Sequence, residues 1–75
     1  MVTLISITAG EILSLLEKYQ GCVPVNKIQQ YLEEPPELIF MALGWLVRQG
    51  LVKMEGKNHQ YVVFLAQISR FVSKD

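Results

Sequence analysis

Residues 36–49, with the sequence PELIFMALGWLVRQ, decide the fold of this chain. It is the longest run of residues with a clear helical period, and it carries almost no charge. It also contains the single tryptophan and a mid-helix glycine. At about 100° per residue it is apolar nearly all round, and such a helix is usually covered on both sides. The pattern assigns a core face to Ile39, Leu43, Leu46 and Val47, with Phe40 near its edge, and an outward face to Leu38, Met41, Gly44, Trp45 and Arg48.

A first helix is predicted from a capping box at Thr8-Ala9-Gly10-Glu11. In this motif the Thr hydroxyl satisfies a backbone N–H and the Glu reaches back to another. Apolar residues then recur at helical spacing, and Gly21 suits the left-handed cap that ends a helix. The apolar residues 2–7 fit either an edge strand or an early helical turn.

A second, short helix is predicted after Pro24, because the missing N–H of proline costs nothing at a helix start. Its apolar stripe consists of Val25, Ile28 and Leu32. The helix ends at the turn formed by residues 33–35, because proline disfavours helical geometry in the residue before it.

The last part of the chain has the pattern of a β-hairpin. Residues 51–55 and 59–65 are the predicted strands, joined by Gly56-Lys57-Asn58, whose Gly and Asn supply the positive φ of a tight turn. The second strand is apolar on both faces, so its outer face needs a cover. Three candidates are residues 66–72, with helical spacing of Ile68, Phe71 and Val72, the N-terminal residues, and a second chain.

This order of elements predicts an α+β, mainly helical fold: a winged helix-turn-helix with a three-helix core and a two-stranded β-hairpin wing. The 75 residues are expected to form a single domain, with its core at about residues 6–65 and a C-terminal extension at residues 66–75. The predicted core contains Ile12, Leu16, Ile28, Leu32, Ile39, Leu43 and Leu46.

Two motifs carry a resemblance to a known family. Thr8-Ala9-Gly10-Glu11-Ile12 followed by Met41-Ala42-Leu43-Gly44-Trp45-Leu46-Val47-Arg48 resembles a family of small stand-alone prokaryotic winged helix-turn-helix proteins of unknown function. The resemblance rests on an A-G pair in the first helix and an A-L-G-W-L core in the third, and it covers residues 6–65. It implies the fold, and it brings no assigned activity and no site residues. The tail after residue 65 is longer than the family pattern.

Composition argues against several classes of function. A formal net charge of +0 gives no support to a phosphate-binding surface, which is usually basic. The single cysteine rules out an intrachain disulfide and fits a reducing cytoplasm. No run approaches the roughly 18 apolar residues of a membrane span. A hydrophobic fraction of 51% is high for so short a chain, which favours either a very complete core or apolar surface given to a partner.

Residues typical of a chemical site are scarce. Cys22 and His59 are too few for a structural zinc site, which needs about four ligands. We expect Cys22 to be a small buried hydrophobic residue and His59 to lie exposed at the wing. The glycines are too scattered for a phosphate loop. We therefore expect no catalytic residues, no metal, no cofactor and no small-molecule substrate, and an enzyme is the least favoured class.

The outward face of the helix at residues 36–49 is the main candidate site. Leu38, Met41 and Trp45 are the predicted partner-binding residues, because aromatic residues and Met are enriched in interface cores. The alternative for Trp45 is packing under the wing strands. We expect a non-enzymatic interaction module that binds another protein or a second copy of itself. Gly44 costs about 1 kcal/mol in mid-helix, which predicts close approach of another backbone or of a ligand.

A DNA-binding transcriptional regulator is the alternative function. The first residues of a recognition helix reach base edges, and the productive pairings need Arg or Lys for guanine and Asn or Gln for adenine. Here those positions hold Pro36, Glu37, Leu38 and Met41, and Glu33 and Glu34 lie beside them. The candidate phosphate contacts are Lys27, Arg48, Lys53 and Lys57.

Overall fold

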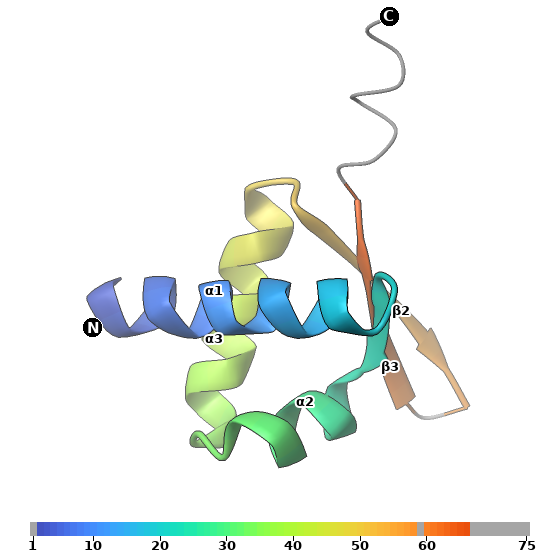
Figure 1. Ribbon diagram of the computed structural model, residues 1–75, viewed down its shortest axis with the longest axis horizontal. Helices are drawn as coiled ribbons and strands as arrows, with labels where there is room; N and C mark the ends of the chain where they lie inside the picture. Colours follow the sequence, from blue (N-terminus) through green and yellow to red (C-terminus); the bar gives the residue numbers. More distant parts are fainter. Residues whose placement is uncertain (1, 59, 67–75) are drawn as a thin grey trace, which may run out of the picture.

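The computed structural model describes residues 2–58 and 60–66, apart from the side chains of residues 2 and 57. The elements follow in the order α1 (Val2–Lys18), β1 (Cys22–Pro24), α2 (Val25–Leu32), α3 (Pro36–Arg48), β2 (Val52–Lys57) and β3 (Gln60–Leu65). Figure 1 shows α1 crossing in front of α3, with α2 below α1 at the level of the lower end of α3, and the sheet to their right. The predicted α+β, mainly helical, winged helix-turn-helix fold is confirmed. The expectations for His59 and for residues 68, 71 and 72 lie outside the described residues.

Helix α1 is longer than the capping box predicts. Thr8 lies inside it and is only 2% exposed, so its predicted role as an N-cap is wrong. The physical reason is that the apolar stripe continues back to Ile5, which packs against the core. Burial of that stripe extends the helix through the apolar residues before Thr8, and the edge-strand alternative for them is excluded.

The end of α1 has the hydrogen bonds of a Schellman motif. The N–H of Gly21 donates to the carbonyl of Leu16 (2.6 Å), and the N–H of Gln20 donates to the carbonyl of Glu17 (3.3 Å). The left-handed position of the motif falls on Gln20, with φ 66°, and Gly21 follows with φ 89°. The chain therefore reverses sharply into β1.

The turn between α2 and α3 follows the predicted proline signal. Glu33 ends α2 in the left-handed region (φ 54°), and Pro35 precedes the first residue of α3. Helix α3 closes on Gly50, whose φ of 77° suits glycine. The N–H of Leu51 donates to the carbonyl of Leu46 (3.0 Å), so the chain enters β2 directly.

The sheet contains one strand more than the hairpin. Its order is β1-β3-β2, all antiparallel, so the short extended piece after α1 joins the edge of the wing. Strands β2 and β3 pair as far as Lys57 and Gln60, so the ladder runs past the predicted turn. The predicted turn at Gly56-Lys57-Asn58 is therefore wrong, because Gly56 continues the ladder opposite Tyr61.

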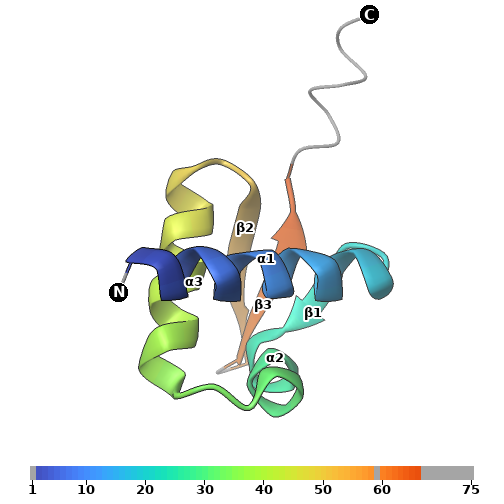
Figure 2. The same cartoon turned by 60° about the vertical axis from the view of Figure 1, so that its left-hand side comes forward.

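The core lies between the helices and one face of the sheet. Val23, Val52 and Val63 supply the sheet side and are at most 2% exposed. Helices α1 and α3 pack across each other, and each carries a buried alanine, Ala9 on α1 and Ala42 on α3. Figure 2 shows this crossing from the side. The predicted core is confirmed, and Leu32 lies half-buried at its edge. The confirmed core residues are Ile12, Leu16, Ile28, Leu32, Ile39, Leu43 and Leu46.

Candidate functional site

The most apolar exposed surface on a single element lies on α3. Four large hydrophobic side chains of this helix are exposed: Phe40 by 51%, Val47 by 43%, Met41 by 40% and Trp45 by 38%. We call the exposed side of the helix the outer α3 face. It comprises Glu37, Phe40, Met41, Gly44, Trp45, Val47 and Arg48.

The rotation of α3 about its own axis differs from the prediction. Leu38 is only 9% exposed, so its outward placement is wrong, and Phe40 and Val47 lie outside the core to which the pattern assigned them. The pattern used large side chains to find the inward face and gave no weight to Ala42. Because Ala42 is fully buried, the buried side of the helix is centred further round than those side chains suggest. Met41 and Trp45 keep their predicted outward positions.

Gly44 lies at the centre of the outer α3 face. An added Cβ at this position would meet nothing within 4 Å, so the predicted close approach of another backbone of the chain is wrong. Gly10 on α1 is also exposed and also faces open space. No close contact within the described chain therefore compensates for the low helix propensity of Gly10 or of Gly44.

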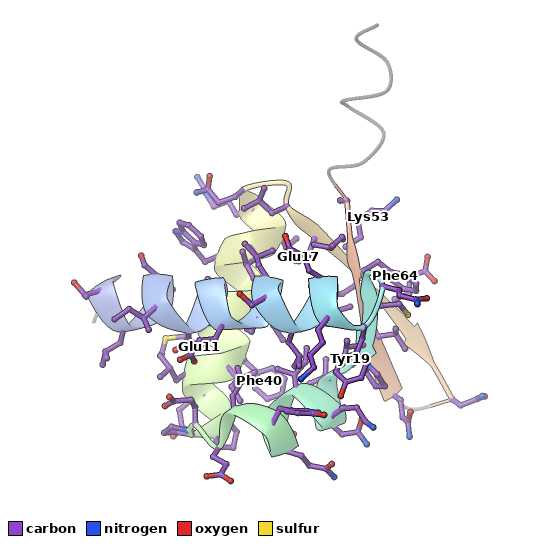
Figure 3. The ribbon with its side chains drawn as sticks, in the orientation of Figure 1. Glu11, Glu17, Tyr19, Phe40, Lys53 and Phe64 are labelled. Carbon is purple, nitrogen blue, oxygen red and sulfur yellow. The ribbon has the colours of Figure 1, made fainter. Side chains whose placement is uncertain are left out.

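The edge of the outer α3 face nearest α2 borders a hollow. Phe40 leaves α3 on the side of α2 (Figure 3) and lines a hollow of about 320 Å³ together with Tyr61 of β3. Tyr61 is 59% exposed, and it covers Gly56 on the neighbouring strand. The apolar surface thus extends from α3 to the hairpin. The remaining lining residues are Val25, Asn26, Gln29 and Gln60.

The structure does not bring the candidate phosphate contacts together. Lys27 is exposed on α2, Arg48 is exposed at the end of α3, and Lys53 is exposed on the sheet. In Figure 3 Lys53 lies beside the sheet at the upper right, whereas α2 runs along the bottom of the molecule. The side chain of Lys57 lies outside the described part. The described bases therefore form no single basic surface along the outer α3 face.

The outer face of the sheet is a second, smaller apolar surface. Phe64 and Val62 of β3 are half-buried there, flanked by Lys53 and Glu55 of β2. Cys22 of β1 lies opposite Phe64 and is exposed, so its predicted burial is wrong. The N-terminal residues proposed as a cover belong to α1 and pack on the helical side instead.

Two tyrosines join α1 to α2. The hydroxyls of Tyr19 and Tyr31 are hydrogen-bonded, and their rings pack edge to face with centroids 5.7 Å apart. The ammonium of Lys18 lies 5.9 Å from the centroid of the Tyr31 ring. The hydrogen bond to Tyr31 raises the pKa of Tyr19, and desolvation and the charge of an ionised Tyr31 raise it further. This contact borders an open groove of about 430 Å³ between the two helices, which Ile7, Gly10 and Leu15 also line.

The described residues contain no cluster of metal ligands and no membrane-spanning helix. In residues 2–58 and 60–66, no three His, Cys, Asp or Glu side chains gather closely enough to hold a metal ion. None of the helices in this part of the chain has the length and apolar character needed to cross a bilayer. Comparison with protein-family models and with curated proteins finds no match to this chain.

Proposed function

We propose that this protein is a non-enzymatic winged-helix interaction module that binds another protein through the outer α3 face. The observation that supports the proposal is the exposure of Phe40, Met41, Trp45 and Val47 on one helix. Aromatic residues and Met are enriched at the centres of protein interfaces, whereas Lys and Glu are depleted there. On this face the charged residues Glu37 and Arg48 stand at the two ends and the apolar residues lie between them.

The energy available from this face is substantial. Complete burial of a Phe or Met side chain contributes about 1.5–3 kcal/mol, and these side chains are still 40–51% exposed. Four such residues, together with Tyr61 beside them, can contribute several kcal/mol toward the cost of association. Apolar exposure on this scale is typical of binding surfaces.

DNA binding is the second candidate, because α2, the turn, α3 and the hairpin have the helix-turn-helix order. The side chains that α3 presents argue against it. At its N-terminal half the exposed residues are Pro36, Glu37, Phe40 and Met41, and none of them forms the bidentate pairs that read guanine or adenine. A carboxylate at this end also opposes the phosphate attraction on which nucleic-acid affinity depends.

The experiment places a photo-crosslinking amino acid at position 41, in cells that express the full chain. A matched variant carries the same group at Lys53, which is also exposed but lies on the outer face of the sheet. We expect a discrete protein adduct from position 41 and a much weaker one from position 53.

Binding of a mixed-sequence DNA duplex is measured in parallel over a range of salt concentrations. Affinity that falls steeply with salt is the signature of phosphate contacts. Steeply salt-dependent DNA binding, weakened by Arg48→Gln and combined with no adduct from position 41, would contradict the proposal in favour of the DNA-binding function.

A further inference from the structure

We infer that the partner of the outer α3 face is a second copy of the same chain, with the two α3 helices packed antiparallel about a two-fold axis. This inference rests on the proposed function and names the partner. It is carried by the arrangement of charges and shapes along the face, which is complementary to itself when one copy is reversed.

The charges give the first argument. Glu37 and Arg48 lie at opposite ends of the outer α3 face, about 16 Å apart along the axis. At about 100° per residue they point in nearly the same direction from the helix. An antiparallel second copy places Glu37 opposite Arg48 of the other chain, and the two-fold axis repeats the pair. A parallel arrangement in register would instead place like charges opposite each other.

The shape of the face gives the second argument. In the register set by the charges, Met41 of one chain lies at the level of Gly44 of the other. Gly44 has open space above it, so the helices can approach closely and the flexible Met41 side chain can fill that space. The four positions 37, 41, 44 and 48 have the alternating spacing of four, three and four residues that forms the seam of paired helices.

The aromatic residues complete the interface on its two flanks. Phe40 and Trp45 lie on opposite sides of the seam, so the two-fold axis brings each beside its own counterpart. The paired rings are then about 7–8 Å apart along the axis, within reach of side chains that extend toward each other. Close approach of the second α3 helix thus compensates for the low helix propensity of Gly44, which contacts within one chain leave unexplained.

The expected affinity is modest. A contact made by one pair of helices of this length falls below the 1,200–2,000 Å² that stable complexes usually bury. A dissociation constant in the range of about 10–500 µM is therefore expected. Such a dimer covers the position of a recognition helix, so self-association and base reading through α3 are mutually exclusive.

Sedimentation equilibrium between 10 µM and 1 mM tests the inference with charge reversals. Glu37→Arg alone and Arg48→Glu alone each place two like-charge pairs in the dimer and should weaken it by about tenfold. A mixture of the two variants restores both opposite-charge pairs, so it should form a heterodimer at least as tight as the wild-type dimer. High salt should reduce both the weakening caused by the single charge reversals and the recovery seen in the mixture.

A pair of glycine variants controls for effects on folding. Gly44→Gln fills the space that Met41 enters and should abolish dimerisation. Gly10→Gln makes the same change at another exposed mid-helix glycine with open space, and it should leave dimerisation unchanged.

A monomer at 1 mM overturns the inference, as does a dimer that neither Gly44→Gln nor the charge reversals weaken. The crosslink from position 41 then separates the two claims. If that crosslink captures a different protein, the proposed function stands and only the choice of partner fails. If it captures nothing, both fail.

Discussion

Replacement of Gly44 by alanine should stabilise the monomer. A glycine in mid-helix costs about 1 kcal/mol relative to alanine, and an added Cβ at position 44 meets nothing within 4 Å. The gain is therefore expected without any steric loss. For a domain of this size, 1 kcal/mol corresponds to an increase in Tm of about 4–8 °C.

Gly10→Ala is the matched control, because Gly10 has the same helical setting and the same free space. Thermal and urea unfolding are followed by circular dichroism at about 0.5 µM protein, where less than about a tenth of the chains are dimeric even at the tight end of the affinity expected above. Both variants should gain about the same free energy of unfolding. A lower stability for Gly44→Ala at this concentration would mean that another part of the chain occupies the space beside Gly44, and the structural reasoning would be refuted.

Three further outcomes are expected. Ala42→Leu should lower the free energy of unfolding by about 1–3 kcal/mol, because Ala42 is fully buried in the core; unfolding in urea measures it, and an unchanged midpoint would contradict that packing. Gly50→Ala should destabilise by about 1 kcal/mol in the same assay, because φ is 77° there; equal stability would mean that the helix ends differently. The Tyr19 hydroxyl keeps its proton to higher pH in the folded chain than in the unfolded chain. The stability that protonated Tyr19 contributes is therefore complete below about pH 10 and is lost as the pH rises through the raised pKa. Absorbance titration should therefore show Tyr19 ionising at lower pH in Tyr31→Phe than in the wild type, and identical titrations would contradict the Tyr19–Tyr31 hydrogen bond.

The sequence predicts the types and order of the elements because each has a local cause. Prolines at 35 and 36 separate α2 from α3, and Gly50 supplies the positive φ that ends α3. Residues 36–49 carry apolar residues at helical spacing. These signals act within a few residues, so they need no knowledge of the tertiary packing.

The rotation of α3 depends on packing that local signals do not contain. The helix is apolar nearly all round, so large side chains such as Leu38 and Val47 fit either face equally well. In the structure Ala42 is fully buried together with Leu38 and Ile39, and these positions mark the side of α3 that faces the core. A pattern that includes alanine among the buried positions finds the correct face and adds Phe40 and Val47 to the candidate site.

The N-terminal boundary and the wing turn were mispredicted for the same kind of reason. Thr8 to Glu11 matches a capping box, yet the buried stripe that includes Ile5 continues the helix through it. At the other end, Gly56 resembles a turn residue, but it pairs with Tyr61 and the strands extend beyond it. In both places long-range contacts outweigh a short local motif.

Quenching of Trp45 fluorescence by acrylamide tests the central claim most directly, because the single tryptophan lies on the outer α3 face. We predict that the quenching constant of the wild type falls by about twofold or more between about 0.5 µM and 1 mM protein, as a second copy covers the indole. In Gly44→Gln the constant should stay high at both concentrations. A wild-type constant that does not change with concentration, or a decrease that persists in Gly44→Gln, would contradict the claim that α3 pairs with α3 of a second copy.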